Sequence, residues 1–452
     1  MIPPKPASRP RQASLWRYFR LFRQDILSAQ PAHLYRARMA EFRTPFFRSF
    51  LLGEPDLVEE VLKRRPEDFP KSDRISEGLR PLLGQSVFLT NGETWRRQRR
   101  LIDPAFDRGK LAKSFPAMLE AGTDMLARLR TMGPEPLDVE PPMSRVAADI
   151  IFRTLFSIPI TEPLADEIFQ AFRAYQRQQP LLNAGAVLTL PRWMPRGHRQ
   201  STREAAKRIR MALLALIAER AFALREGCAP DDLATALMTA RDPETGRGFS
   251  EDEMLDQVAI FFLAGHETSA AALAWALMLL AMHPAVQDRV AEEVRGLPEN
   301  PSLSDISGLT LTRNVWRETL RLYAPVPMMV REASRREVFR ERRVPKGAQI
   351  VISPWHLHRH ERHWEAPDAF DPDRFDRAVT EGAYLPFSAG PRICPGAGFA
   401  MVEGPLILAL ICRAFRLTLD ESRMPVPVAH LTVRSRDGIY MSLTDRSEAA
   451  AR

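Results

Sequence analysis

Residues 386–406, PFSAGPRICPGAGFAMVEGPL, place Cys394 in a frame of prolines and glycines directly before an apolar run. The glycines at positions 390, 396 and 398 let the backbone come close to a flat, bulky group, and the prolines stiffen the loop. A cysteine ahead of a helix has its thiolate favoured by the helix N-terminus. The loop is therefore typical of a nucleophile, a redox thiol or a metal ligand.

Cysteine is rare in this chain, with three among 452 residues, and the other two are Cys228 and Cys412. A nucleophile needs a histidine base, and a redox thiol usually has a second cysteine close by. Cys412 lies about five helical turns beyond Cys394 along the same predicted helix. A lone thiolate ligand is left, and a lone axial thiolate indicates haem. The wide spacing also argues against a disulfide framework and for a reducing compartment.

The composition limits the partners. The chain is 45% apolar, enough for a sizeable core, and carries 64 basic against 56 acidic residues, a formal charge of +8. This surplus suits an acidic protein or anionic lipid, and without a basic stripe interleaved with aromatic residues we expect no nucleic-acid partner. The first 24 residues hold no apolar run of anchor length, although LWRYFRLF could touch a membrane surface. We expect a cytoplasmic protein without a transmembrane anchor.

Most of the chain is patterned as helix. Residues 204–226 carry apolar residues at helical spacing and stop at a glycine. The longest candidate begins after Ser250, which can form a capping box with Glu253, and ends at His283 before a proline. It would be about 48 Å long at 1.5 Å per residue, enough to cross a domain. The charge of Glu267 in its apolar middle favours a buried core helix over a membrane span.

Signals for β-strands come late in the chain. The segments REVF and QIVIS, on either side of the turn PKG, predict one small sheet, and LTVRS and IYMSL predict a hairpin joined through Asp437 and Gly438. No internal repeat or linker divides the sequence. We therefore expect a mainly α fold with small β-sheets, in which residues 1–40 form a tail and a leading helix and residues 41–452 form a single domain.

The cysteine loop also matches a family signature. Its pattern is F-x-x-G-x-R-x-C-x-G, formed by Phe387, Gly390, Arg392, Cys394 and Gly396. This pattern resembles the haem-binding signature of the cytochrome P450 monooxygenases, in their soluble, bacterial type. The resemblance implies haem b (heme b) as cofactor, with Cys394 as the metal ligand, Phe387 packed near the sulfur, and the two glycines admitting the porphyrin.

Four other stretches resemble motifs of the same family, in the family's order. They are WRRQR with Trp95 and Arg99, AGHETS at 264–269, RETLR with Glu318 and Arg321, and DPDRF, which has Asp373 in place of the family's glutamate and supplies Arg374. The resemblance runs from about residue 45 to the end of the chain. It implies a cytochrome P450 fold, with a helix-rich lobe, a smaller β-rich lobe, and haem between a distal and a proximal helix.

The resemblance gives these positions roles. A buried triad that supports the cysteine loop would consist of Glu318, Arg321 and Arg374. Haem propionates need charged donors, and the candidates are Trp95, Arg99, Arg331 and Arg392. The groove for dioxygen would be formed by Ala264 and Gly265. Proton delivery would fall to the Thr268 hydroxyl, which orders water, and to the neighbouring Glu267.

The histidine run HLHRHERH, residues 356–363, invites interpretation as a metal site. Its spacing fits neither a zinc finger nor an i, i+4 histidine pair beside a glutamate. The resemblance places the run in the stretch that leads to DPDRF. We expect a structural role for these histidines.

The resemblance implies a monooxygenase that inserts one oxygen atom of dioxygen into a lipophilic substrate. Electrons would come from NAD(P)H through a separate ferredoxin or flavodoxin and its reductase. Such partners are acidic, and a monomer would meet them with Arg96, Arg97, Arg100 and Arg413.

The resemblance also indicates which residues line the substrate pocket, and the charged ones among them are Arg80 and His430. The pocket-lining stretches are otherwise apolar and comprise residues 75–88, 180–191, 261–264, 326–330 and 429–433.

Two alternatives differ in their use of electrons. A peroxide-dependent or rearranging haem-thiolate enzyme would need no electron donor, but such relatives often lack the acid and alcohol that Glu267 and Thr268 supply. A haem-binding sensor without catalysis would come with an output domain, for which the sequence gives no sign. Substrate-dependent consumption of NAD(P)H distinguishes the monooxygenase from both.

Overall fold

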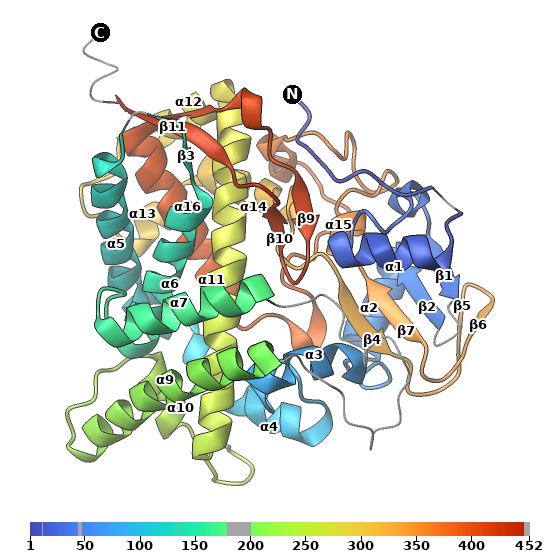
Figure 1. Cartoon of the computed structure of the whole chain (residues 1–452), viewed down its shortest axis with the longest axis horizontal. Coiled ribbons are helices and arrows are strands. Elements are labelled where there is room, and N and C mark those ends of the chain that lie inside the picture. Colours follow the sequence, from blue (N-terminus) through green and yellow to red (C-terminus); the bar gives the residue numbers. More distant parts are fainter. Residues whose placement is uncertain (11, 44–47, 134, 179–199, 447–452) are drawn as a thin grey trace.

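The computed structural model of the chain describes residues 1–446 except 11, 44–47, 134 and 179–199. A large helical lobe lies beside a smaller lobe that holds most of the sheet strands (Figure 1). The helices are α1 (Leu15–Gln24), α2 (Pro55–Glu59), α3 (Asp73–Leu83), α4 (Gly92–Ile102), α5 (Arg108–Thr131), α6 (Glu140–Phe156), α7 (Pro163–Gln178), α9 (Gln200–Arg225), α10 (Leu233–Thr239), α11 (Glu251–Met282), α12 (Pro284–Arg295), α13 (Leu303–Gly308), α14 (Thr310–Leu322), α15 (Pro354–Leu357) and α16 (Ala397–Ala414).

The strands form four small sheets within the described residues. The largest has the order β1-β2-β7-β4, with β2 and β7 parallel and the other pairs antiparallel; its strands are β1 (Met39–Arg43), β2 (Arg48–Leu52), β4 (Met329–Glu332) and β7 (Gln349–Ile352). The others are β5 (Glu337–Phe339) with β6 (Arg342–Val344), β9 (Pro427–Ala429) with β10 (Val433–Ser435), and β3 (Leu137–Asp138), β11 (Tyr440–Asp445) and β8 (Phe415–Leu419). The predicted fold class, mainly α with small β-sheets, is confirmed.

Helix α11 runs through the whole helical lobe (Figure 1). The predicted capping box is present, because Ser250 and Glu253 each accept a hydrogen bond from the other's backbone amide. The helix packs against α6, α9, α14 and α16. By length and composition α11 and α16 could each cross a membrane, but 78% and 72% of their most apolar windows are buried inside the fold. This burial agrees with the interpretation of α11 as a core helix.

Two predictions of strand pairing are wrong. REVF contains β5, which pairs with β6, whereas QIVIS contains β7, which pairs with β2 and β4. LTVRS contains β10, paired with β9, and IYMSL lies in β11, paired with β8 and β3. The turn at Asp437 and Gly438 therefore links two sheets and closes no hairpin. The early strands β1 and β2 were not anticipated. An alternating pattern identifies a strand, but its partner depends on distant segments.

The N-terminal segment packs onto the body of the protein. The Tyr323 hydroxyl donates to the Pro4 carbonyl oxygen at 2.7 Å, and the Ile26 amide donates to the Ala429 carbonyl oxygen at 3.0 Å. The expected leading helix corresponds to α1, which is capped by the Ser14 side chain. These contacts hold the N-terminal segment against Tyr323, directly after α14, and against the end of β9.

Candidate functional site

The cysteine loop is closed by its own backbone. The amide of Cys394 donates to the carbonyl oxygen of Phe387 at 2.9 Å. Gly390 adopts φ +68°, and a Cβ there would lie 2.0 Å from the carbonyl oxygen of Leu62, in the π-helical turn at 60–64. Close packing of two backbones therefore accounts for glycine at position 390, where the sequence had suggested an approach to a flat group.

The Cys394 side chain is accessible, although protein groups surround the thiol. A Cβ at Gly396 would lie 3.9 Å from the sulfur, so this glycine leaves the space beside it free of a side chain. Burial raises the pKa of the Cys394 thiol, while the Gly396 amide and then the cations of Arg99 and Lys71 lower it. The amide at the N-terminus of α16 thus favours the thiolate as expected, but burial outweighs it. A bound metal cation would deprotonate the thiol that coordinates it.

In the middle of α11, a short stretch departs from the buried pattern. Ala264 is exposed and Thr268 is half-buried, whereas residues on both sides of each are largely buried. The Thr268 hydroxyl donates to the Ala264 carbonyl oxygen at 2.5 Å. Such a bond competes with the hydrogen bonds of the helix itself and often bends it. This is the local feature expected of a groove for a small ligand.

Gly265 and Glu267, which lie between Ala264 and Thr268 in the sequence, contact other elements of the fold. A Cβ at Gly265 would lie 2.4 Å from Ile151 Cδ1, so this glycine allows α11 and α6 to pack closely. The buried Glu267 accepts hydrogen bonds from three side chains, at 2.9, 2.7 and 2.5 Å respectively: Gln176, Thr432 and Arg434. The carboxylate is thereby held by α7 and β10. Among the described contacts, no hydrogen bond joins Glu267 to Thr268, although the two are adjacent in sequence.

Three cations next to the cysteine loop have no carboxylate partner among the described residues: Lys71, Arg331 and Arg392. Arg331 is 5% exposed, and among the described residues its guanidinium donates only to the Val330 carbonyl oxygen, at 3.3 Å. The Arg392 guanidinium donates to Asn91 Oδ1 at 2.8 Å. The same Asn91 oxygen accepts from the backbone amide of Lys71 at 3.0 Å, which ties the two basic residues together.

Burial disfavours the charged forms of all three cations, and neighbouring arginines add repulsion at Arg392 and Lys71. Burial lowers the pKa of Arg331 to about 10. Burial, followed by repulsion from Arg331 and Arg99, lowers the pKa of Arg392 to about 9. Burial, followed by repulsion from the three arginines, lowers the pKa of Lys71 well below its usual value. A cluster of this kind stabilises anions that enter it.

Trp95 and Arg99, both on α4, hold this region in place. Arg99 donates to the Ile393 carbonyl oxygen at 2.7 Å and forms an ion pair with Asp103 at 2.8 Å. The guanidinium of Arg392 lies 4.1 Å from the centroid of the Trp95 ring, a cation–π distance. The W-x-x-x-R residues therefore contact the cysteine loop directly.

This donor set fits a haem. A haem iron needs a strong axial ligand, a role that the Cys394 sulfur would fill, and its two propionates need cations, which Lys71, Arg331 and Arg392 would provide. Lys71 was missed from the sequence, because a single lysine in FPKSD belongs to no motif. Asn91 was missed for the same reason. Lys71 and Asn91 lie on opposite sides of α3 in the sequence, and only the fold brings them into contact.

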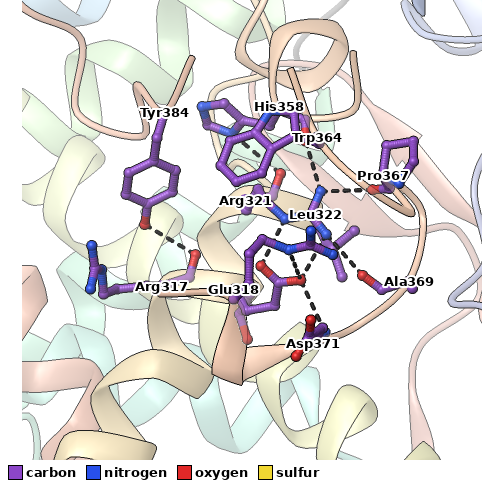
Figure 2. A network of polar contacts seen from close by, with 12 residues as sticks. Arg317, Glu318, Arg321, Leu322, His358, Trp364, Pro367, Ala369, Asp371 and Tyr384 are labelled. Carbon is purple, nitrogen blue, oxygen red and sulfur yellow. Dashed lines mark hydrogen bonds and ion pairs between the residues drawn. The ribbon is translucent and has the colours of Figure 1, made fainter. Parts of the chain in front are cut away.

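The predicted triad is present and fully buried. Glu318 and Arg321 on α14 are both 0% exposed and pair through two hydrogen bonds of 2.7 Å (Figure 2). Arg374 adds a longer ion pair to Glu318 at 3.3 Å. The backbone amide of Asp371 donates to the same carboxylate at 3.0 Å. Asp373, which replaces the family's glutamate, is half-exposed and pairs with Arg289.

Arg321 also fastens the chain that follows α15. Its guanidinium donates to the carbonyl oxygens of His358 and Pro367 at 2.7 Å and of Ala369 at 2.9 Å (Figure 2). One charged group thus satisfies the backbone of a loop that has few regular hydrogen bonds. The triad fixes the segment leading to the cysteine loop.

The histidine run has structural partners. His358 Nε2 accepts from the Leu385 amide at 2.8 Å, so its Nδ1 carries the proton donated to the Arg321 carbonyl oxygen. Burial lowers the pKa of His358 to about 3, which keeps it neutral. His356 Nδ1 contacts the Ser353 hydroxyl at 2.8 Å. The described residues contain no group of three or more metal-ligating side chains, here or elsewhere.

The arginines expected to meet a redox partner are engaged locally. Arg96 pairs with Glu67 and Glu93. The others have partners as follows: Arg97 with Glu253, Arg100 with Asp242, Glu93 and Glu244, and Arg413 with the carbonyl oxygens of Leu297 and Pro298. Acidic side chains therefore offset three of the four charges.

Glu403 on α16 is a buried carboxyl group that the sequence did not single out. Ser269 of α11 donates to its Oε2 at 2.8 Å, while Oε1 has no hydrogen-bond partner among the described residues. Burial raises the pKa of Glu403 from 4.5 to about 7. An ionised carboxylate is costly at this position.

We expect Glu403→Gln to be more stable than the wild type above pH 7, by about 3 kcal/mol. The folded state binds the Glu403 proton more tightly than the unfolded state. The wild type therefore loses stability as pH rises from about 4.5 through about 7. Thermal unfolding at pH 5 and pH 8 tests this. A difference between variant and wild type that does not grow with pH would contradict it.

Comparison with known proteins places the chain among relatives. The family model for cytochrome P450 matches residues 39–442. The chain is 36% identical over 405 residues to cyclooctat-9-en-7-ol 5-monooxygenase of Streptomyces melanosporofaciens, covering 87% of this chain and 84% of that protein. It is 31% identical over 432 residues to cyclooctatin synthase of the same organism, covering 93% and 89%. It is 30% identical over 401 residues to a cytokinin hydroxylase of Arabidopsis thaliana, covering 87% and 78%.

The match covers both lobes and every motif of the site. The family implies a thiolate-ligated haem and electrons that derive from NAD(P)H through redox partners. The matched range includes the cysteine loop, the Ala264–Thr268 stretch of α11 and the buried triad. The chain belongs to the cytochrome P450 family of haem-thiolate monooxygenases.

Proposed function

We propose that this P450 hydroxylates a lipophilic, polycyclic substrate of terpenoid type. The observation that carries the proposal is a set of exposed apolar side chains within otherwise buried runs, namely Phe88, Ala264 and Val326. All three lie in stretches that the sequence assigns to the pocket; residues 180–191, assigned likewise, lie outside the described residues. A relative that is named for its action on cyclooctat-9-en-7-ol supports this class of substrate. Apolar walls with few polar groups suit such a molecule.

In this proposal, each part of the site has one task. The haem, when bound, supplies the activation of dioxygen. Cys394 is its ligand, with Phe387 packed near the sulfur and Gly396 leaving room beside it. The propionates bind Lys71, Arg331 and Arg392, while Trp95 and Arg99 hold Arg392 and the loop. Ala264 and Gly265 shape the groove on α11.

Proton delivery falls to Thr268 in this proposal. Its hydroxyl exchanges the Ala264 carbonyl for an ordered water and passes a proton toward the reacting oxygen. Glu267 takes part through a water molecule, which replaces one of the three side chains that donate hydrogen bonds to its carboxylate. Because Arg434 pairs with Glu267 at 2.5 Å, we expect that step to require movement of β10.

We expect Arg331→Met to weaken haem binding about ten- to a hundredfold, since hydrogen bonds to charged groups contribute about 1.5–3 kcal/mol. The rate of haem transfer from the holoprotein to excess apomyoglobin measures the effect. Arg336→Met, an exposed arginine in the next turn of the chain, is the matched control and should leave the rate unchanged. Equal rates for the two variants would remove Arg331 from the propionate site.

We expect Thr268→Ala to retain haem and substrate but to divert most NAD(P)H electrons to hydrogen peroxide. The reason is that the groove loses the hydroxyl that orders water for proton transfer. Peroxide formed per NAD(P)H consumed is the measurement. Thr123→Ala is the control, because Thr123 on α5 makes the same bond to the carbonyl four residues back, at 3.0 Å. Unchanged coupling in Thr268→Ala would refute the role.

The function itself is tested with purified holoprotein and a surrogate redox pair. Lipophilic compounds are screened for a shift of the haem spin state, and those that bind are tested for NAD(P)H consumption and product mass. The proposal expects products heavier by one oxygen atom. Product formation from hydrogen peroxide alone, at a rate equal to that with the donor, would favour the peroxide-dependent or rearranging alternative.

The proposal also covers the electron donor of the enzyme, its oligomeric state and its location. We propose a ferredoxin or flavodoxin with its reductase as electron donor, a monomeric enzyme and a cytoplasmic location. Because acidic neighbours offset Arg96, Arg97 and Arg100, the reduction rate should respond less to salt than four free arginines would predict.

A further inference from the structure

A groove of about 630 Å³ lies between α3, α9 and the first turns of α11. It is separate from the residues of the haem site: none of its lining residues belongs to the cysteine loop, the cation cluster or the α11 groove. The lining consists of Arg80, Pro81, Arg203, Lys207, Arg210, Met211, Leu214, Asp252 and Leu255. The monooxygenase function leaves this groove unused.

The charges of the groove are strongly one-sided. Four of its lining residues are basic and one, Asp252, is acidic. Arg210 is committed, because it pairs with Asp256 at 2.6 Å and donates to the Leu82 carbonyl oxygen at 3.0 Å. By contrast, Arg203 and Lys207 are exposed and form no ion pair with any described residue. They lie one helical turn apart and thus share a face of α9.

Arg80 adds a third cation from α3, in a long ion pair with Glu77. Its Nε lies 3.4 Å from a carboxylate oxygen of Glu77, yet this buried atom makes no hydrogen bond with a described residue. The sequence had singled out Arg80 as a charged exception in an apolar stretch. The structure places it in this groove, where it faces the basic stripe of α9.

The rest of the lining is apolar. Pro81, Leu214 and Leu255 come from three different helices, and Met211 is 60% exposed. An exposed methionine beside cations forms an adaptable apolar surface next to an anion site. A small hydrophilic anion would use the cations alone, whereas an amphiphile with one acidic end would use both parts of the lining.

We propose that this groove binds an amphiphilic carboxylate of fatty-acid type, with the carboxylate at Arg80, Arg203 and Lys207 and the chain along Met211 and its apolar neighbours. The groove is largely open to solvent, and its volume suits one small molecule. Net positive charge selects the anion, and the apolar surface selects the chain. The site is a second ligand site, whose lining shares no residue with the cysteine loop, the cation cluster or the Ala264–Thr268 stretch of α11.

The test is calorimetric titration of the holoprotein with decanoate, below its micelle concentration, with the haem spectrum followed in parallel. We expect saturable binding without a shift of the haem spin state. Arg203→Glu and Lys207→Glu should each weaken this binding about tenfold or more. Arg208→Glu is the matched control, because Arg208 is exposed on α9 but does not line the groove. It should bind decanoate as the wild type does.

Three results would overturn the proposal. One is unchanged decanoate binding in Arg203→Glu and Lys207→Glu. Another is binding that always accompanies a shift of the haem spin state, which would place decanoate in the haem pocket. The third is equal affinity for inorganic phosphate or for 1-decanol, because either would show that one half of the lining contributes nothing. Loss of monooxygenase activity in these variants is not predicted, so the proposed function is tested separately.

Discussion

Glu318→Ala is expected to abolish the accumulation of folded, haem-loaded protein. The substitution would leave Arg321, which is 0% exposed, and the buried Arg374 without their carboxylate. Removing one partner of a buried ion pair costs about 3–5 kcal/mol. Whole proteins are stable by only about 5–15 kcal/mol, so this loss is a large fraction of the total.

The loop after α15 would be affected as well. Arg321 donates to three backbone carbonyls in that loop, and its orientation depends on the two bonds to Glu318 (Figure 2). A reoriented guanidinium leaves those carbonyl oxygens buried and unsatisfied. We therefore expect the segment leading to the cysteine loop to lose its order together with α14.

Haem absorbance per protein and the midpoint of thermal unfolding measure the effect. Glu318→Gln keeps the shape and one acceptor oxygen, so it should fall between the wild type and Glu318→Ala. Asp373→Ala is the control, because it breaks the exposed bidentate pair with Arg289 and should cost less than about 1 kcal/mol. A Glu318→Ala protein that matches Asp373→Ala in both measurements would contradict the structural role.

The sequence was most informative where structure is local. The bounds of α11 could be predicted because Ser250, Glu253 and the proline after His283 act within one helical turn. The triad could be predicted because Glu318 and Arg321 are three residues apart on a helix. The fold class followed from the resemblance, which rests on five short motifs in order.

The strand partners could not be predicted in the same way. The segments around β7 and β10 have the alternating pattern of strands, yet this pattern does not say that they pair with β2, β4 and β9. Of these partners, β2 is far away in the chain, β4 is separated from β7 by the β5–β6 pair, and β9 directly precedes β10. A turn signal such as Asp437 and Gly438 marks a reversal, but the two strands it joins can each pair elsewhere.

The residues of the candidate site also divide into those that a local motif identifies and those that only the fold brings together. Motif residues such as Cys394 and Arg392 could be proposed from the sequence, whereas Lys71, Asn91 and Arg434 could not. The missed residues act only through contacts between distant segments: Asn91 joins Lys71 to Arg392, and Arg434 of β10 holds Glu267 of α11. The sequence indicated that the helix N-terminus favours the Cys394 thiolate, but only the structure shows that burial outweighs this effect and raises the pKa of the thiol.

Cys394→Ala is expected to eliminate the thiolate haem and monooxygenase activity together. In the described structure, the loop presents no second sulfur that could replace it, because Cys412 is buried and Cys228 belongs to the chain after α9. An alanine would leave the loop backbone intact, since the bond from residue 394 to the Phe387 carbonyl uses only the amide. Haem could then bind at most through its propionates and apolar faces.

Cys228→Ala is the matched control for this variant. Cys228 is exposed, and its sulfur donates to the Ala223 carbonyl oxygen at 3.6 Å. The same chemical change there should leave haem content, stability and activity as in the wild type. The comparison separates loss of the ligand from loss of any thiol.

The most direct measurement is the absorption spectrum of the reduced protein under carbon monoxide. A haem with a thiolate ligand gives a carbonyl band shifted to the red of that given by a haem with a nitrogen ligand. The account predicts this red-shifted band in the wild type and in Cys228→Ala, and its complete absence in Cys394→Ala. A wild type without the band, or a Cys394→Ala variant that keeps it, would contradict the assignment of Cys394 as the haem ligand.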